Sequence, residues 1–282
     1  MVQLRYVLMM AGCAACLGVA AERTVDPTFL RRNVADVKPA AVYTATETCE
    51  YRPLFGEGDS VTSIVRSVAR FGEITVKPGG ACKDVRFDNQ EEIYIVMEGA
   101  GALHTGATAT RVRKNDFLYV PANISHNLVN YAASPLRAIV AGYKLTKPMP
   151  GTAVSIANLD EVKKQTVGGH PDSVLYQLMM GDTTSTRDRL ATAQVMVSLY
   201  VMSFAPGGTN FPHHHDSEEE IYVLLDGKGD MVAGSGTDGV EARFPAKPGD
   251  AYFFRLNCTV GFYNSKEGPA RILALRSTYP RR

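Results

Sequence analysis

The pattern of apolar and polar positions changes at residue 50 or so, after a polar stretch. From there on, short runs rich in Val, Ile, Tyr, Phe and Thr alternate with clusters of Gly, Pro, Asn and Asp. Runs of this length, bounded by turn residues, predict β-strands. Helical periodicity is weak and predicts only two short helices, at Asn33–Lys38 and Asn158–Gln165, with Asn158 as a candidate N-cap. The pattern therefore predicts an all-β protein.

The predicted strands fall into two sets that repeat one another. Lys77–Gly80 returns as Ala205–Gly208, and Glu91–Gly101 returns at the same separation as Glu219–Gly229. A short insertion near 234–240 accounts for the longer separation of the segments that follow. Such self-similarity indicates two copies of one structural unit.

The repeat defines the predicted domains. We expect one β-barrel at 33–145 and a second at 155–282. A Pro-rich linker at 146–154 joins them and leads into the short helical connector. Residues 22–32 are polar and contain proline, so they are predicted to form an N-terminal arm. A chain of 282 residues is long enough for two ordinary domains.

Residues 1–21 differ from the rest of the chain. Arg5 is their only charge, the run Tyr6–Ala20 is apolar or small, and Val19–Ala21 fits a cleavage site. These features predict a secretory signal peptide and a secreted or periplasmic protein. Met10–Cys13 loosely resembles a lipoprotein box, so a lipid anchor is a minor alternative, and an uncleaved N-terminal anchor is another. The run is short for a membrane span, and no later segment is long enough for one.

The charge balance limits the class of partner, and the cysteine count limits the number of disulfides. The 30 Lys and Arg residues nearly balance the 29 Asp and Glu residues, so no basic field predicts a nucleic-acid partner. Without the signal peptide three cysteines remain, Cys49, Cys82 and Cys258. An odd number permits at most one disulfide within the chain, and its pairing stays open. Buried thiols are the expected state for at least two of the three.

The stretch 207–227 holds three of the six histidines in the chain. His213 and His215 are two apart, and residues i and i+2 of a strand face the same side, whereas His214 faces away. Glu220 follows after a predicted turn at 216–218 and opens an apolar run. Two imidazoles and one carboxylate from adjacent strands form a usable ligand set for a divalent transition metal.

The spacing of Gly207, His213, His215, Glu220 and Gly227 resembles the first motif of the cupin superfamily. Together with the repeat, it makes the chain similar to a two-barrel cupin, or bicupin. The resemblance implies two tandem jelly-roll barrels, also described as double-stranded β-helices, each with a site in its mouth. It also implies one divalent transition metal ion (Fe, Mn, Zn, Ni or Cu) in the second barrel.

The repeat allows each ligand position to be compared between the two barrels. Val85 and Phe87 stand where His213 and His215 stand, so the first metal site is predicted to be degenerate. Glu92 stands where Glu220 stands.

The second cupin motif implies one further histidine ligand. The first barrel has it, at His126, whereas the second barrel has Val260 at that position. We therefore expect Glu92 and His126 to form a hydrogen-bonded pair without a metal. The second barrel keeps three of the four ligands in the usual set.

Other residues are weaker candidates. Arg255 could bind a carboxylate or phosphate of a substrate at the barrel mouth, and Glu220 could serve as both ligand and proton acceptor. Glu219 is the alternative carboxylate if the turn is one residue shorter, and Cys258 is an alternative ligand. His104 and His170 lie outside both motifs and are predicted to be surface or loop residues.

The resemblance is to quercetinase-like dioxygenases and oxalate-degrading bicupins. It implies a metal-dependent dioxygenase, lyase or isomerase that acts on a small carboxylate, sugar-acid or phenolic substrate. The alternative is a non-catalytic bicupin that binds a small ligand or serves storage, because a cupin fold does not fix a reaction. Either protein could be a monomer or a homodimer.

Overall fold

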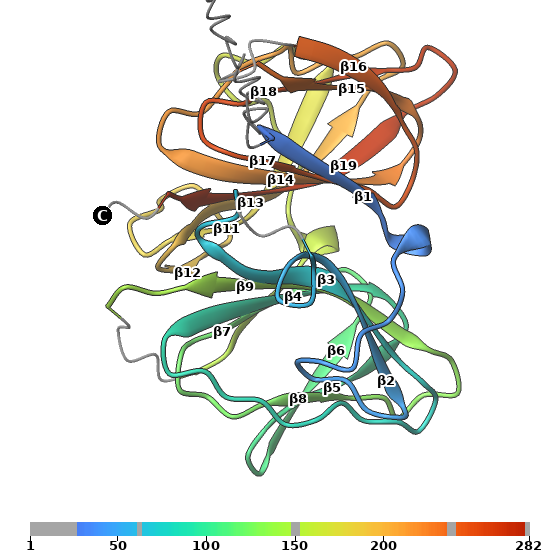
Figure 1. Ribbon diagram of the computed structural model, residues 1–282, viewed down its shortest axis with the longest axis vertical. Helices are drawn as coiled ribbons and strands as arrows, with labels where there is room; N and C mark the ends of the chain where they lie inside the picture. Colours follow the sequence, from blue (N-terminus) through green and yellow to red (C-terminus); the bar gives the residue numbers. More distant parts are fainter. Residues whose placement is uncertain (1–26, 61–63, 148–152, 236–240, 280–282) are drawn as a thin grey trace, which may run out of the picture.

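The computed structural model describes residues 27–60, 64–147, 153–235 and 241–279, and it consists of two β-barrels packed on each other (Figure 1). The predictions of an all-β fold and of tandem jelly-roll barrels are confirmed. The predicted signal peptide at 1–21, residues 22–26 of the predicted arm and the centre of the predicted linker lie outside the described residues, and the end of the arm is not a free arm but part of a strand, β1. Within the described ranges, no helix has the length and apolarity needed to cross a membrane.

The first barrel joins a six-stranded sheet to a three-stranded sheet. The large sheet has the order β10, β7, β4, β9, β3, β2, and the small sheet the order β6, β5, β8. The strands are β2 (Cys49–Gly56), β3 (Val68–Val76), β4 (Gln90–Glu98), β5 (Ala100–Thr105), β6 (Thr108–Arg113), β7 (Asp116–Val120), β8 (Asn127–Val129), β9 (Leu136–Lys144) and β10 (Ser155–Asn158).

The second barrel repeats this plan with one additional edge strand. Its large sheet has the order β1, β17, β14, β19, β13, β11, β12, and its small sheet the order β16, β15, β18. The strands are β1 (Phe29–Asn33), β11 (Val174–Asp182), β12 (Leu190–Ala193), β13 (Met196–Phe204), β14 (Glu218–Asp226), β15 (Gly229–Gly234), β16 (Glu241–Ala246), β17 (Asp250–Phe254), β18 (Thr259–Asn264) and β19 (Ala270–Thr278).

The two barrels exchange their first strands. β1, at the beginning of the first repeat, pairs antiparallel with β17 of the second barrel. β10, at the beginning of the second repeat, pairs antiparallel with β7 of the first barrel. Residues 155–158, which the repeat assigns to the second barrel, and residues 29–33 before the first therefore each complete the sheet of the other barrel.

The two predicted helices are single 3-10 turns, η1 (Val34–Asp36) and η2 (Leu159–Glu161). The predicted helix Asn158–Gln165 is therefore too long, although Asn158 does cap η2 through a bond from the backbone N–H of Asp160. The amide of Gln177 explains the early end, because it donates to the carbonyls of Leu159 and Val162 at 2.9 and 2.7 Å. Those carbonyls would accept from the next turn if the helix continued.

The strand that carries the site alternates between two environments. In β14, Ile221 and Val223 point into the core between the barrels, whereas Tyr222 and Leu224 point into the interior of the second barrel. Successive strand residues face opposite sides of a sheet, so Glu219 and Glu220 divide in the same way. Figure 1 shows the two large sheets facing each other across this shared core.

Glu219 is buried between the barrels, where it accepts bonds from the backbone N–H groups of Arg66 and Ser67 at 2.9 and 2.8 Å. Glu91 of the first barrel makes the equivalent contact with the second barrel, where it accepts from the backbone N–H groups of Val195 and Met196 at 2.9 Å each. We call these two contacts the reciprocal glutamate contacts. Each barrel thus supplies a carboxylate to the backbone of its neighbour.

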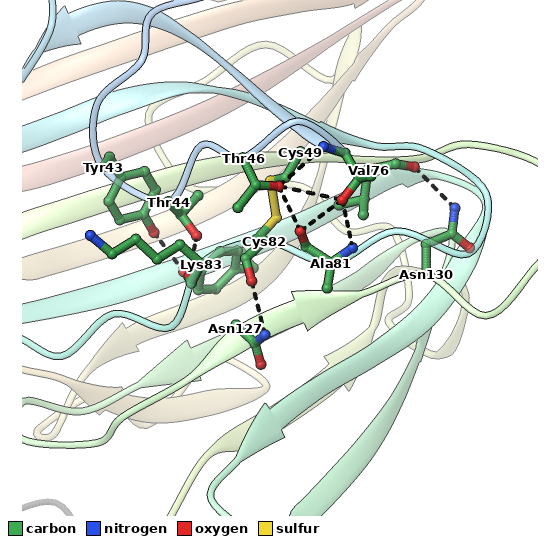
Figure 2. The surroundings of a disulfide bond; sticks show 12 residues. Tyr43, Thr44, Thr46, Cys49, Val76, Ala81, Cys82, Lys83, Asn127 and Asn130 are labelled. Carbon is green, nitrogen blue, oxygen red and sulfur yellow. Dashed lines mark hydrogen bonds between the residues drawn. A yellow bond between two sulfur atoms is a disulfide. The ribbon is translucent and has the colours of Figure 1, made fainter.

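Cys49 and Cys82 form a disulfide in the first barrel, with their Cα atoms 4.9 Å apart. The expectation of thiols for at least two cysteines is therefore wrong, and Cys258 is the buried free thiol among the described residues. Figure 2 shows the bond beside the segment that precedes β2, where the Thr46 hydroxyl donates to the Ala81 carbonyl at 2.8 Å. The disulfide and this bond fasten that segment to the barrel wall.

Candidate metal centre

The register of the strands tests the ligand positions that the repeat predicts. In the first barrel Val85 pairs with His126, and in the second barrel His213 pairs with Val260. The same two backbone positions therefore carry valine and histidine in opposite order, as predicted. The equivalence of the two barrels is confirmed at the positions on which the site depends.

The second barrel brings His213, His215 and Glu220 together. Their donor atoms all lie within 4.8 Å of one another, and this group of three could hold a metal ion. His213 exchanges two backbone bonds with Val260, and the His215 carbonyl accepts from the N–H of Asn257 at 2.9 Å. The segment is therefore extended, and both imidazoles point to the same side.

Backbone contacts orient the first imidazole. His213 Nδ1 lies 2.9 Å from the carbonyl oxygen of Phe211, which can only accept a hydrogen bond. Nδ1 therefore carries the proton, and Nε2 keeps its lone pair for a metal. Phe211 holds a left-handed φ of 54° and is exposed, so its backbone serves the site while its side chain stays at the rim.

Two polar atoms in the site are buried without a hydrogen-bond partner, His215 Nε2 and Glu220 Oε2. They lie 3.2 Å apart, and Tyr200 donates to the other carboxylate oxygen of Glu220 at 3.1 Å. Each atom is thus the ion-pair partner of the other but makes no well-aligned hydrogen bond, which leaves both buried atoms incompletely satisfied. A cation between them would satisfy both, and the residues present therefore fit a divalent transition metal.

The charges around Glu220 shift the pKa values of the site. Burial alone would raise the pKa of Glu220, but the imidazole of His215 and the charges of Arg276 and His213 lower it overall. Burial lowers the pKa of His215, and Glu220 more than reverses this effect. The carboxylate is thus held in its ionised form, which is the form that binds metals.

Arg276 is an arginine of the site that the sequence reading missed. It lies on β19 directly opposite Glu220, and its guanidinium contacts Glu218 at 3.1 Å. Its Nε atom is buried without a hydrogen-bond partner. Arg255, the arginine predicted from the sequence, follows the end of β17, and its backbone N–H donates to Thr28. Of these two arginines, Arg276 is the one whose charge helps to lower the pKa of Glu220.

Three further sequence candidates have other places in the structure. Glu219, the alternative carboxylate, faces the first barrel and not the site. Cys258 donates from its thiol to the backbone carbonyls of Gly234 and Thr259. His170 was predicted to lie away from the site, but its ring lies 5.8 Å from that of His213, between centroids. His170 does lie in a loop before β11, as predicted, but its nearness to the candidate ligands was not predicted.

The first barrel holds a closed polar cluster at the equivalent place. One oxygen of Glu92 pairs with the buried guanidinium of Arg70. The other lies 2.8 Å from His126 Nε2 and 3.1 Å from the hydroxyl groups of both Tyr43 and Tyr94. The predicted Glu92–His126 pair is confirmed. Every carboxylate oxygen in this cluster has a partner, and apolar side chains occupy the remaining ligand positions.

The comparison with known families agrees with this geometry. The cupin domain matches residues 72–142 and 200–276. The chain therefore belongs to the cupin family, with one such domain in each barrel.

Solved structures with the same fold cover nearly the whole chain. The protein YlbA from E. coli is 16% identical with a TM-score of 0.68, over 93% of this chain and 96% of that one. Bacillus subtilis oxalate decarboxylase, described with Mn(II) centres, is 12% identical with a TM-score of 0.66, over 92% and 79%. The Lactobacillus farciminis oxalate decarboxylase, in a formate complex, is 12% identical with a TM-score of 0.67, over 92% and 88%. These identities show a shared fold only, and no curated protein matches the sequence.

Proposed function

We propose that this protein is a secreted, metal-dependent enzyme whose single metal centre lies in the second barrel. The observation that carries the proposal is the convergence of three metal-binding side chains, in which the buried His215 Nε2 and Glu220 Oε2 make no hydrogen bond and face each other as an ion pair at 3.2 Å. A protein that only packed this barrel would be expected to satisfy these atoms, as the first barrel does for Glu92.

The substrate class follows from the charges of the site. Arg276 brings a buried guanidinium to within the electrostatic reach of Glu220, and its Nε has no hydrogen-bond partner. A small carboxylate, a sugar acid or a phenolate would place an anionic oxygen near this charge. Oxalate is a reasonable first substrate to test, because the oxalate decarboxylases share the fold.

The roles of the chain's own residues follow from their positions. His213, His215 and Glu220 would hold the metal ion, and Tyr200 would fix the orientation of the Glu220 carboxylate through its 3.1 Å bond. A bound divalent metal would act as a Lewis acid toward an oxygen of the substrate. Arg276 would bind the anionic group of the substrate, and Glu220 is the base nearest to the reacting atoms.

The first experiment is a measurement of metal content by inductively coupled plasma mass spectrometry, on untagged protein secreted from its natural precursor. The proposal predicts about one transition metal ion per chain, since only one barrel has the ligand set. The variant His213→Ala/His215→Ala should lose the metal. The variant His104→Ala/His214→Ala removes two histidines outside the ligand set and should keep it.

The metal found would select the activity assays. Iron or copper would lead to dioxygenation, manganese to oxalate-type redox chemistry, and zinc or nickel to isomerisation or lyase reactions. Absence of metal from the unmodified protein, even after loading with Fe(II), Mn(II) or Zn(II), would overturn the proposal. The protein would then be better explained as a bicupin that binds a small ligand without catalysis.

A further inference from the structure

The segments that lead from each 3-10 turn into the next strand have the same length in both halves. We call them connecting segment 37–48, between η1 and β2, and connecting segment 162–173, between η2 and β11. The strand registers confirm their equivalence, because Tyr51 in β2 and Tyr176 in β11 occupy the same place in their sheets. A comparison of what the two segments bring to each barrel is therefore justified.

Connecting segment 37–48 delivers a polar side chain to the buried carboxylate of the first barrel. Tyr43 lies 3.1 Å from Glu92 through its hydroxyl, and its ring packs edge-on against Tyr51 at 5.2 Å. It has a left-handed φ of 58°, which is unusual for a tyrosine and turns the side chain inward. The segment therefore completes the set of groups around Glu92.

Connecting segment 162–173 places His170, two residues beyond the equivalent of Tyr43, against the equivalent tyrosine of the second barrel. The ring of His170 packs on Tyr176 at 5.3 Å, as Tyr43 packs on Tyr51. It also lies edge-on to the ring of His213, at 5.8 Å between centroids. Its Nδ1 atom is buried and has no hydrogen-bond partner, so it resembles the two orphaned atoms in the ligand group.

His170 therefore lies beside a ligand set that has two histidines, one fewer than the usual cupin set. We propose that His170 is the fourth protein ligand of the metal in the second barrel, in place of the histidine that Val260 does not supply. The inference rests on the proposed function, because it requires a metal at His213, His215 and Glu220.

The distances fit this role. A metal–nitrogen bond of about 2.1 Å puts the centre of each imidazole about 3.2 Å from the metal, so two such rings on one ion lie about 4.5 to 6.4 Å apart. The rings of His213 and His215 are 5.1 Å apart, and those of His213 and His170 are 5.8 Å apart. Both separations fall within the range for ligands of a common ion, but His170 is outside the group whose donor atoms all lie within 4.8 Å of one another, so its ring must move inward to bind.

The segment can adjust its position when a metal binds. Gly168 and Gly169 directly precede His170, and nothing lies within 4 Å of where a side chain would begin at either residue. Gly169 has a left-handed φ of 83°, a conformation that glycine adopts without cost. This Gly-Gly pair permits the small inward movement that brings the His170 nitrogen to bonding distance.

The test counts the imidazoles on the metal and does not depend on activity. The full mature protein is loaded with Cu(II), and electron spin-echo envelope modulation measures the number of bound imidazoles. We expect three in the unmodified protein and two in His170→Ala. Titration calorimetry with Zn(II) should show an affinity about tenfold or more weaker in His170→Ala, as expected when a ligand is lost.

Two controls make the result specific. His104→Ala removes a histidine that contacts Tyr131 in the first barrel, and it should keep three imidazoles and the original Zn(II) affinity. Thermal unfolding of metal-free His170→Ala should match that of the unmodified protein, which excludes misfolding as the cause of weaker binding.

The possible failures are distinguishable. Two imidazoles in the unmodified protein, or an unchanged spectrum and affinity in His170→Ala, would overturn the role of His170 and leave the proposed function intact. Failure of the unmodified protein to bind either metal would overturn both.

Discussion

The two barrels share one backbone plan and differ in how each treats the same buried glutamate. In the first, Glu92 is enclosed by Arg70, His126 and two tyrosine hydroxyls. In the second, one oxygen of Glu220 makes no hydrogen bond and has only an ion pair with His215, at 3.2 Å, beside a second histidine. The difference teaches that one cupin interior can be completed by protein groups alone, or left open for a cation.

The two barrels also differ in which strand carries the buried arginine near the glutamate. Arg70 on β3 pairs with Gly142 on β9, whereas in the second barrel Ser198 on β13 pairs with Arg276 on β19. The arginine is thus on opposite strands of equivalent pairs. A side chain at Gly142 would collide with the Arg70 guanidinium, since its Cβ would lie 2.8 Å from the nearest nitrogen. Each barrel has room for one arginine, and only that of the first neutralises its glutamate directly.

The largest expected effect comes from the disulfide, which is a further difference between the barrels. In the first barrel it joins the first residue of β2, directly after connecting segment 37–48, to Cys82 (Figure 2). Cys49 and Cys82 are 33 residues apart, and closing a loop of that size contributes about 3.7 kcal/mol by chain entropy. The variant Cys49→Ala/Cys82→Ala should lose about that much stability in urea unfolding. Its metal content should not change, and a loss of metal would show that the first barrel also controls the site.

The next effect comes from the same substitution in both barrels. Glu92→Gln should lower the free energy of unfolding by about 3 kcal/mol, because it removes the buried partner of Arg70 and leaves this charge only the more exposed Glu57, at 2.9 Å. Glu220→Gln in metal-free protein should cost less, about 2 kcal/mol, because it loses the bond from Tyr200 and the ion pair with His215, whereas Arg276 stays paired with Glu218. Urea unfolding in the presence of a chelator measures both. Equal losses would contradict the distinction between a closed and an open site.

Val260 gives a way to make the second barrel more like the usual cupin. Val260→His places an imidazole at the position from which His126 reaches Glu92 in the first barrel. In the His170→Ala background it should tighten Zn(II) binding by about tenfold, or 1.4 kcal/mol, in titration calorimetry. Val260→Leu in the same background is the size control and should give no gain. An equal effect of both substitutions would refute the equivalence of the two positions.

The smallest effect is on acid stability. Burial would raise the pKa of Glu92, but His126 and Arg70 hold it below its usual value of 4.5. Because the folded pKa is lowered, Glu92 contributes stability above the unfolded value, and this is lost as the pH falls through the folded value. The stability difference between unmodified protein and Glu92→Gln should therefore shrink between about pH 6 and about pH 3 in urea unfolding. A constant difference would mean that the charge of Glu92 is not what stabilises the cluster.

Much of this comparison could be predicted from the sequence because the repeat aligns the two halves. The first barrel has Val85 and His126 where the second has His213 and Val260, and this reversed order of valine and histidine followed from spacing alone. Strand alternation then sets Glu220 inward, whereas the structure was needed to show that Glu219 serves the other barrel.

The features that the sequence did not reveal depend on contacts between distant segments. His170 lies in an irregular segment with no strand period to predict where its side chain points. Arg276 reaches the site through the pairing of β14 with β19, and the strand exchange of β1 and β10 depends on how the barrels dock. Cys49 and Cys82 lie in neighbouring elements, but pairing among three cysteines is not specified by their number.

The reciprocal glutamate contacts mean that the barrel without a metal ligand set is not dispensable. Glu219 is anchored by backbone N–H groups of the first barrel, and it directly precedes Glu220 on the same strand. The exchange of β1 and β10 adds a second mutual dependence, so we expect the two barrels to depend on each other as the subunits of an obligate heterodimer do. A fragment cut at the sequence repeat would lack one edge strand and leave a buried carboxylate without donors, so each half should fold only when the other is present.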